Sequence, residues 1–300
     1  MKRGATLREL GENAVVAAIT RGLPLSPKVR AGAGDDCAVI GGPRDRTWEL
    51  LKTDVVVEGV HFLPETDPAR VGWKALGRAI SDFAAMAGTP EHALITLAVR
   101  PETAFAWVQG LYRGLRRAAA RYGVSIVGGE TSCSPGPTFV NVALTGTVER
   151  RRCVLRSGGS PGNAVYVTGL LGGSLAGKHL DFAPRLAEAL WLAERFRPTA
   201  MMDVSDGLGA DLPRLAEASG CSFSLDESAV PRTRGCTVAQ ALTDGEDFEL
   251  LFAIEPRQAA RLESAWKRKF PKTRLTRIGE LTRARAPKTN RPSNGYDHFT

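Results

Sequence analysis

Long apolar runs are missing from this sequence of 300 residues. The best run near the amino terminus, from Ala14 to Ile19, is too short for the apolar core of a secretory signal and far too short to span a membrane. We therefore expect neither a leader peptide nor a membrane partner.

Paired cysteines are missing as well. The cysteines are odd in number and show no Cys-x-x-Cys or Cys/His spacing typical of a zinc site; they are Cys37, Cys133, Cys153, Cys221 and Cys236. A disulfide framework is therefore not expected, and a reducing, cytoplasmic location fits best.

Signatures of nucleic-acid binding are also missing, although the formal net charge is +8. A basic run between Lys267 and Arg291 favours attraction to nucleic acid or phosphorylated metabolites, or is simply a solvated surface. Because no zinc finger, RNA-recognition signature or array of stacking aromatics accompanies it, we expect a solvated surface and no nucleic-acid partner. A basic, non-catalytic nucleic-acid-binding protein stays open as an alternative, which predicts steeply salt-dependent binding and no ATP turnover.

What the chain does have is the length for two domains and a hydrophobic content of 43%, enough for a sizeable core. The glycine- and serine-rich stretch from Arg156 to Gly162 interrupts the series of expected helices and strands, so the predicted domains are 1–153 and 154–300. Helices are expected over 6–21, 68–88, 102–122, 184–195, 208–218 and 256–269, and strands over 36–40, 48–57, 93–99, 124–127, 138–148, 164–168, 223–225 and 248–254, with a loop-like tail from residue 282. This clustered order predicts an α+β fold with mixed or antiparallel sheets covered by helices.

Carboxylates recur at expected strand ends and turns, often beside glycines. They are Asp35, Asp36, Asp54, Asp82, Glu130, Asp203, Asp206, Asp244, Glu246 and Asp247. Each alone could be a turn residue or a helix cap. As a set they would repel one another unless cations neutralised them, and Mg²⁺ prefers such oxygen ligands together with substrate phosphates. The pattern indicates several Mg²⁺ ions that hold a polyphosphate, with the glycines letting the backbone approach it.

The segment 172–179, GGSLAGKH, matches the GxxxxGK pattern of a phosphate-binding loop. It has His179 where that loop needs a serine or threonine for Mg²⁺, and its spacing from the preceding strand is loose. We therefore interpret Lys178 as unrelated to phosphate binding and His179 as a structural or surface histidine.

Eight motifs in order carry a family resemblance. They are GAGDDCAV at 32–39, LKTDVVVEGVHF at 51–62, WKALGRAISDFAAMAG at 73–88, VGGETS at 127–132, LRSGGSPGNAVYVTG at 155–169, MMDVSDGL at 201–208, DGEDFELLF at 244–252 and GYDHF at 295–299. Together they resemble the thiamine-monophosphate kinase family, in the superfamily of aminoimidazole-ribonucleotide synthetase. The resemblance implies a two-domain α+β fold, a homodimer formed through the N-terminal sheets, ATP and several Mg²⁺ ions. It also implies direct in-line phosphoryl transfer to thiamine monophosphate.

The resemblance implies roles for individual residues. The metal ligands would be Asp36, Thr53, Asp54, Asp82, Glu130, Asp203 and Asp206. ATP would contact Gly129, Glu130, Arg156, Ser205 and Tyr112, and thiamine would contact His61, Glu246 and Tyr296. Three of these residues, Asp54, Asp206 and Arg156, would act in catalysis. Domain 1–153 would bind ATP and Mg²⁺ and form the dimer, and domain 154–300 would bind substrate and phosphate.

Two positions depart from the family pattern. Glu130 stands where an aspartate is usual, and Lys52 stands where a hydroxyl often serves a metal, so Lys52 either contacts phosphate or points away. An already anionic phosphate acceptor needs no strong general base, so catalysis rests on in-line positioning and charge neutralisation. Another ATP-dependent synthetase or cyclo-ligase of the superfamily stays open as an alternative.

Overall fold

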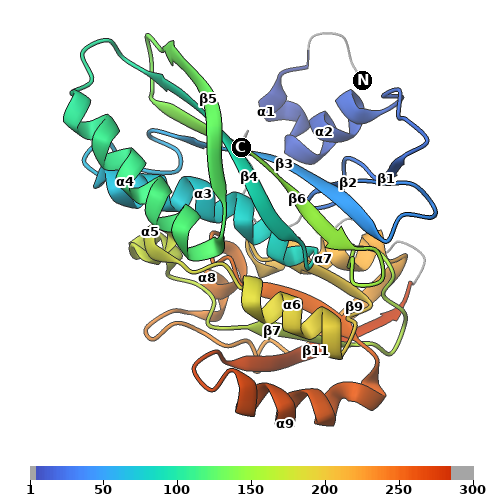
Figure 1. Ribbon diagram of the computed structural model, residues 1–300. Coiled ribbons are helices and arrows are strands. Elements are labelled where there is room, and N and C mark those ends of the chain that lie inside the picture. Colours follow the sequence, from blue (N-terminus) through green and yellow to red (C-terminus); the bar gives the residue numbers. More distant parts are fainter. Residues whose placement is uncertain (1–4, 285–300) are drawn as a thin grey trace.

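The structure, a computed structural model, describes residues 5–284. Two sheets, each with its own helices, form two domains, as the sequence predicts, and the fold is α+β (Figure 1). Tyr296 and the part of the basic run beyond residue 284 lie outside the described residues.

The first sheet has six strands, antiparallel except for the parallel pair β4 and β5. In spatial order they are β1 (Val29–Ala31), β2 (Ala38–Ile40), β3 (Thr47–Val57), β6 (Phe139–Glu149), β4 (Thr89–Val99) and β5 (Ser125–Cys133). Helices α3 (Pro68–Ala85) and α4 (Phe105–Tyr122) cover one face. The other face exposes apolar side chains, including Leu94 (48% exposed) and Val127 (58% exposed).

The second sheet has five antiparallel strands. In spatial order they are β8 (Ala200–Asp203), β10 (Leu250–Ile254), β7 (Ala164–Thr168), β11 (Leu275–Arg283) and β9 (Cys221–Leu225). Its helical elements are η1 (Ser174–Ala176), α5 (Lys178–Asp181), α6 (Leu186–Arg195), α7 (Leu208–Ala218), α8 (Val238–Thr243), η2 (Pro256–Gln258) and α9 (Ala259–Lys269). Strands β7, β8 and β10 are buried along their whole length, which explains their apolar sequences, interrupted only by the last residues Thr168 of β7 and Asp203 of β8.

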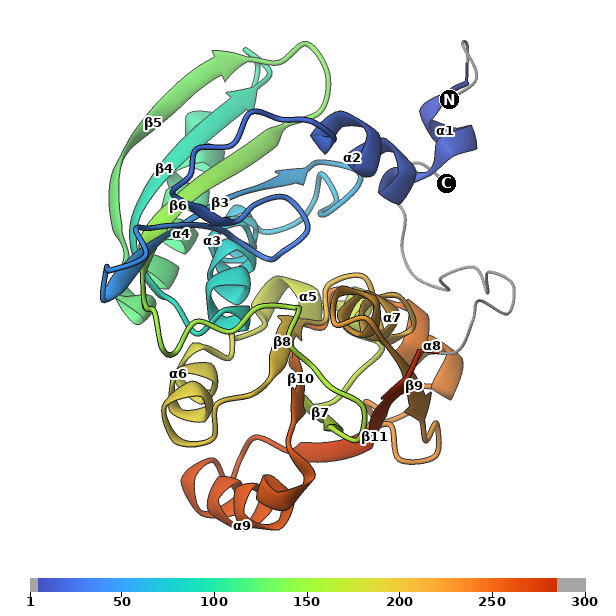
Figure 2. The same ribbon diagram turned by 90° about the vertical axis from the view of Figure 1, so that its right-hand side faces the viewer.

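Helix α3 lies between the two domains and contacts both (Figure 2). The Asp67 side chain caps its first turn by accepting from the Ala69 N–H at 2.8 Å, and Pro68 suits its first position. Gly72 lets α4 approach closely, because a Cβ there would lie 2.0 Å from the Leu111 carbonyl oxygen. Fourteen of the 18 residues of α3 are buried, so its polar side chains Lys74, Ser81 and Asp82 lie in the interior.

Local structure differs from prediction at both ends of the described chain. The helix expected over 6–21 is two helices, α1 (Leu7–Leu10) and α2 (Glu12–Thr20), because the backbone at Gly11 takes a positive φ of 71°. The tail expected to be loop-like from residue 282 begins inside β11, which reaches Arg283 by pairing with Cys221 of β9. That pairing is non-local, and local sequence pattern does not report it.

Candidate active site

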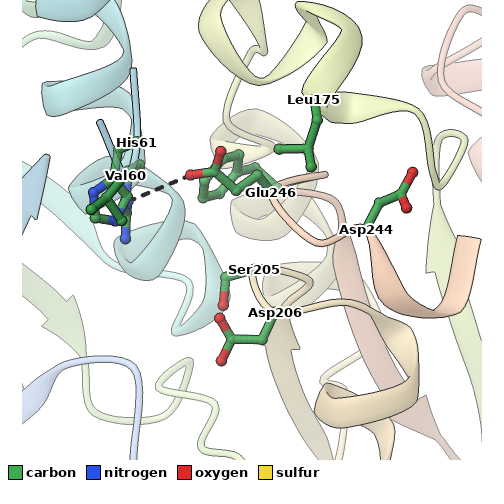
Figure 3. A pocket seen from close by; sticks show the side chains of 9 residues that line it. Val60, His61, Leu175, Ser205, Asp206, Asp244 and Glu246 are labelled. Atoms are coloured by element: carbon green, nitrogen blue, oxygen red, sulfur yellow. Dashed lines mark ion pairs between the residues drawn. The ribbon is translucent and has the colours of Figure 1, made fainter. Parts of the chain in front are cut away.

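Two adjoining pockets lie where the domains meet. The larger, of about 620 Å³, is lined by residues of α2, β3, α3 and α7 and by five of the ten predicted carboxylates. The smaller, of about 160 Å³, has Val60 and His61 on one side and Leu175, Asp244 and Glu246 on the other (Figure 3). Arg78, Ser205, Asp206 and Phe248 line both pockets.

Three buried carboxylates meet beside the larger pocket, and we call them the acid cluster: Asp36, Asp82 and Asp203. They come from the loop before β2, from α3 and from the end of β8, and each has a carboxylate oxygen within 4.8 Å of the others. The Ser81 hydroxyl donates to Asp203 Oδ2 at 2.5 Å and so fixes its orientation.

The acid cluster holds more negative charge than its surroundings balance. Burial and the charge of Asp36 raise the pKa of Asp203 to about 7. Burial also raises the pKa of Asp82 well above its usual value, although the Lys52 ammonium, 3.0 Å away, acts in the opposite direction. Closely spaced oxygen donors that repel one another are the donor set that divalent cations bind, so the residues present fit Mg²⁺.

Basic side chains hold the carboxylates at the edge of the acid cluster. Arg156 donates to both oxygens of Asp36, at 2.7 and 3.2 Å, and its backbone N–H donates to Asp35. Burial and the neighbouring charge of Asp36 raise the pKa of Asp35 to about 6. Arg214 of α7 pairs with Asp206 on the other side of the larger pocket.

Backbone hydrogen bonds join two loops of the second domain beside the pockets, one at residues 204–206 and the other at residues 246–248. Glu246 N–H donates to the Ser205 carbonyl at 2.6 Å, and Phe248 N–H donates to the Val204 carbonyl at 2.8 Å. The buried Asp211 carboxylate accepts from the N–H groups of Ser205 and Asp206 at 3.0 Å. Glu246 and Phe248 both have φ of 51°, a left-handed conformation that is rare outside glycine and that gathers at functional sites.

Glu246 lies among basic side chains beside the smaller pocket, and we call this group the Glu246 cluster: Lys74, Arg78, His179 and Glu246. Lys74 Nζ donates to Glu246 Oε2 at 2.7 Å, and His179 Nδ1 lies 2.9 Å from the same oxygen. Burial alone would raise the pKa of Glu246, but the hydrogen bond with His179 and the charge of Lys74 outweigh it and lower the pKa to about 2. Burial lowers the pKa of Lys74 to about 8 against the opposing pull of Glu246. The glutamate is therefore ionised throughout the physiological range.

His61 is fixed from the same centre. Its backbone carbonyl accepts from Lys74 Nζ at 2.6 Å, and its ring Nδ1 accepts from the Val57 N–H at 3.1 Å. In the neutral ring the proton is then on Nε2, which makes that atom a donor. Lys74 thus ties together the two described residues that the sequence predicts for the thiamine moiety, His61 and Glu246.

Most predicted site residues come together. Seven of them line the larger pocket or belong to the acid cluster beside it: Asp36, Asp54, Asp82, Arg156, Asp203, Ser205 and Asp206. The smaller pocket is lined by His61, Ser205, Asp206 and Glu246 among others.

Four predicted residues lie elsewhere. The Thr53 hydroxyl donates to Asn141 on the exposed face of the first sheet, because neighbouring residues of a strand point to opposite faces. Gly129 and Glu130 are exposed on β5. Tyr112 lines a separate surface hollow on α4.

Several residues of the site were not predicted. Lys74 and Arg78 follow the helical spacing that leads to Asp82, so the polar stripe 74, 78, 81, 82 in an otherwise apolar helix is the signal that could have found them. His179 was expected to be structural or at the surface; its side chain is largely buried against Glu246, so the surface alternative is wrong. Lys52 points into the site, paired with Asp82.

In the GxxxxGK segment the lysine is held by groups of the protein. Lys178 Nζ donates to the Leu170 carbonyl at 2.6 Å and to the buried carboxylate of Asp247 at 3.1 Å. The helix that follows the glycines, α5, has four residues. Lys178 therefore fastens the loop after β7 to the segment before β10.

No helix in the range 5–284 is long and apolar enough to cross a membrane.

Comparison with known proteins gives consistent relatives. Two family models match: AIR synthase related protein, N-terminal domain, over residues 34–148, and its C-terminal domain over residues 160–289. The chain is 36% identical over 273 residues to the thiamine-monophosphate kinase of Rhodopirellula baltica, covering 85% of this chain and 84% of that protein. It is 33% identical over 267 residues to that of Escherichia coli, covering 79% and 80%. A solved structure of AaThiL complexed with AMPPCP and TMP matches with a TM-score of 0.84 at 30% identity, covering 99% of this chain and 100% of that one.

Proposed function

Because this chain belongs to the thiamine-monophosphate kinase family, we propose that it transfers the γ-phosphoryl group of ATP to the phosphate of thiamine monophosphate, which gives thiamine diphosphate. One observation carries the proposal: two adjoining pockets share four lining residues, and one has excess carboxylates while the other has a neutralised glutamate between apolar walls. A polyphosphate with cations suits the first pocket, and a small organic acceptor suits the second.

The larger pocket is the proposed site of ATP and Mg²⁺. Asp36, Asp82 and Asp203 would hold Mg²⁺ together with Asp54 and Asp206, which line the same pocket. Mg²⁺ bound there would neutralise the negative charge of the phosphates. Arg156, oriented by Asp36, is the proposed clamp on ATP phosphate, and Ser205 lies where it can donate to the nucleotide.

The smaller pocket is the proposed site of the thiamine moiety. Val60 and Leu175 are exposed apolar side chains that can contact the flat rings of the acceptor. Glu246 is ionised and can accept a hydrogen bond, and His61 Nε2 can donate one. The predicted contact of Tyr296 with thiamine stays a prediction.

We propose direct transfer in line. An oxygen of the acceptor phosphate forms the new bond to the γ-phosphorus while the bond from that phosphorus to the β,γ-bridging oxygen breaks, and ADP leaves with the electron pair. Because the acceptor oxygen is anionic near neutral pH, no side chain has to remove a proton. The residues around the two pockets bring the reacting groups together and exclude water.

We also propose a cytoplasmic homodimer, with the domain boundary at 153/154. The exposed apolar residues on the open face of the first sheet, Leu94 and Val127 among them, favour burial against a second copy. Thr53, Gly129 and Glu130 lie on or beside this face, so their predicted roles toward metal and ATP would depend on that association. The role of Tyr112 toward ATP stays a prediction.

The test is a direct assay. Purified protein is incubated with ATP, Mg²⁺ and thiamine monophosphate, and the formation of thiamine diphosphate and ADP is followed by chromatography. Unphosphorylated thiamine is the acceptor control, and EDTA is the metal control. Equal amounts of ADP and thiamine diphosphate are expected. ADP without thiamine diphosphate would favour a different acceptor within the superfamily, and no ADP at all would exclude the proposal.

A further inference from the structure

Arg78 is the residue of the site that we consider next, because its side chain borders both pockets. It extends from α3 to the boundary between the pockets and lines both, together with Ser205, Asp206 and Phe248. Among the described residues that line both pockets it is the one cation. If the nucleotide and the acceptor bind as proposed above, any group passing between them passes this side chain.

The guanidinium of Arg78 is held by two carboxylates, one from each domain. Its Nε donates to Asp54 Oδ2 at 3.0 Å, and its Nη1 lies 3.6 Å from Glu246 Oε1. The second contact, the dashed line in Figure 3, is an ion pair but is too long for a hydrogen bond. The guanidinium is therefore fixed in place, although Nη1 makes this ion pair without a hydrogen bond.

That nitrogen is the unusual feature. Nη1 is buried and makes no hydrogen bond to any residue in the range 5–284. A buried charged N–H without an acceptor is costly, and native structures seldom leave one unmatched. Since Asp54 and Glu246 already fix a side chain that lines both pockets, the unsatisfied donor points to an acceptor atom that arrives with a ligand.

The chemistry of the ligand follows from the donor. A guanidinium held in one plane matches the oxygens of a phosphate group and binds them more strongly than a neutral donor would. Under the proposed function, the thiamine rings lie beside Glu246 and His61, while the nucleotide lies beside the acid cluster. The phosphate of the acceptor must then lie between them, which is where Arg78 is.

We propose that Arg78 anchors the acceptor phosphate, with Nη1 donating to a phosphate oxygen, and that it lets the enzyme distinguish a phosphate monoester from the free alcohol. The inference rests on the proposed function and adds a specificity residue to it. Arg78 gives up no proton during transfer; it holds the acceptor oxygen at the boundary of the two pockets while the new bond forms.

The experiment measures affinity for the acceptor with and without its phosphate. Binding of thiamine monophosphate and of thiamine is measured by calorimetry for the wild type, Arg78→Met and Arg78→Lys, with melting temperature as the check on folding. Arg78→Met should weaken thiamine monophosphate binding about 10–100-fold, the scale of one charge-assisted hydrogen bond, and leave thiamine binding unchanged. Arg78→Lys keeps the charge but loses the planar fork, so its loss should be smaller.

Arg70→Met is the matched control. Arg70 is on the same helix and pairs with Asp181 at 2.5 Å, outside both pockets, so its loss should not change either affinity. Equal weakening of thiamine and thiamine monophosphate in Arg78→Met and Arg78→Lys would overturn the anchor role and show that Arg78 shapes the ring pocket. Unchanged affinities would overturn it as well.

The outcome also separates this inference from the proposed function. A wild type that forms thiamine diphosphate while Arg78→Lys and Arg78→Met keep full preference for the phosphorylated acceptor refutes Arg78 alone. A wild type that binds no thiamine monophosphate refutes the proposed function and the anchor with it. If Arg78→Met does not fold, Arg78→Lys still decides, because an unchanged preference in that variant contradicts a role for the planar fork.

Discussion

The acid cluster and the Glu246 cluster shift the pKa of their carboxylates in opposite directions. In the acid cluster, burial and mutual repulsion raise the pKa of Asp203 to about 7. In the Glu246 cluster, Lys74 and His179 outweigh burial and lower the pKa of Glu246 to about 2. The difference teaches that the basic side chains of the Glu246 cluster outweigh the effect of burial on its carboxylate, whereas the basic side chains beside the acid cluster do not.

The largest effect is expected when Lys74, the buried cation of the Glu246 cluster, is removed. Lys74→Met should destabilise the protein by about 3–5 kcal/mol, because it leaves Glu246 buried without its closest partner. Thermal or urea unfolding measures the loss. Lys28→Met, at an exposed lysine, is the control and should change stability by less than about 0.5 kcal/mol.

A double variant tests whether the ion pair with Glu246 accounts for the loss of stability in Lys74→Met. Adding Glu246→Gln to Lys74→Met removes the stranded charge and should recover part of the lost stability. If the double variant is less stable than Lys74→Met alone, the ion pair is not the reason that Lys74 matters.

The next effect is on the acid cluster. Asp203→Asn keeps the shape and the Ser81 contact but removes a proposed metal ligand, so kcat should fall about 10²–10³-fold. Because the substitution also relieves repulsion with Asp36, the metal-free protein should melt no lower than the wild type. Asp226→Asn, at an exposed carboxylate, is the matched control. Near-normal kcat in folded Asp203→Asn would contradict the metal role.

The two clusters should also respond differently to pH. Asp203 keeps its proton up to about pH 7 in the folded state but loses it near its usual value of 3.8 when unfolded. Between those values the folded state binds more protons, so the free energy of unfolding of the metal-free protein falls as pH rises. Asp35 and Asp211 act with the same sign, since their pKa values are raised to about 6 and about 7 by burial and neighbouring carboxylates.

The measurement is melting temperature at pH 5 and pH 7 in EDTA. It should be higher at pH 5, by about 2–4 °C for each kcal/mol of difference. Mg²⁺ should flatten or invert this slope, because bound cations keep the carboxylates ionised. Glu246, with its lowered pKa, adds no slope above about pH 4.5. A metal-free protein that melts lower at pH 5 would refute the excess of charge in the acid cluster.

The smallest effect on activity is expected at Lys178. Lys178→Ala leaves the buried Asp247 with the Gly172 N–H as a remaining partner and should cost about 1–2 kcal/mol of stability. Turnover at a temperature where the variant is folded should be unchanged. Lys178→Arg keeps the ion pair and is the control. A loss of kcat comparable to that of Asp203→Asn would show that the GxxxxGK segment does bind phosphate.

The sequence predicted Asp35, Asp206 and Glu246 from their places beside glycines at turns, where local composition is informative. Because Asp54 lies in a strand and Asp82 in a helix, the sequence predicted those two through the family motifs. It did not predict Lys74, because a lysine in a helix is normally at the surface and only tertiary burial makes it a structural cation. It also placed Thr53 with Asp54, although the strand alternation that separates their side chains is itself readable from sequence. Strand β11 was missed because its partners are distant in the chain.

Helix α3 also limits which mutations the site can accept during evolution. Lys74, Arg78 and Asp82 are each four residues apart, about 6 Å of helix rise and a little more than one turn, so all three side chains lie along one side of the helix. A substitution in this stretch changes one contact. An inserted or deleted residue would rotate everything after it by about 100° and carry Asp82 away from Asp36 and Asp203. Relatives that keep the chemistry should therefore vary in composition along residues 74–82 but not in length.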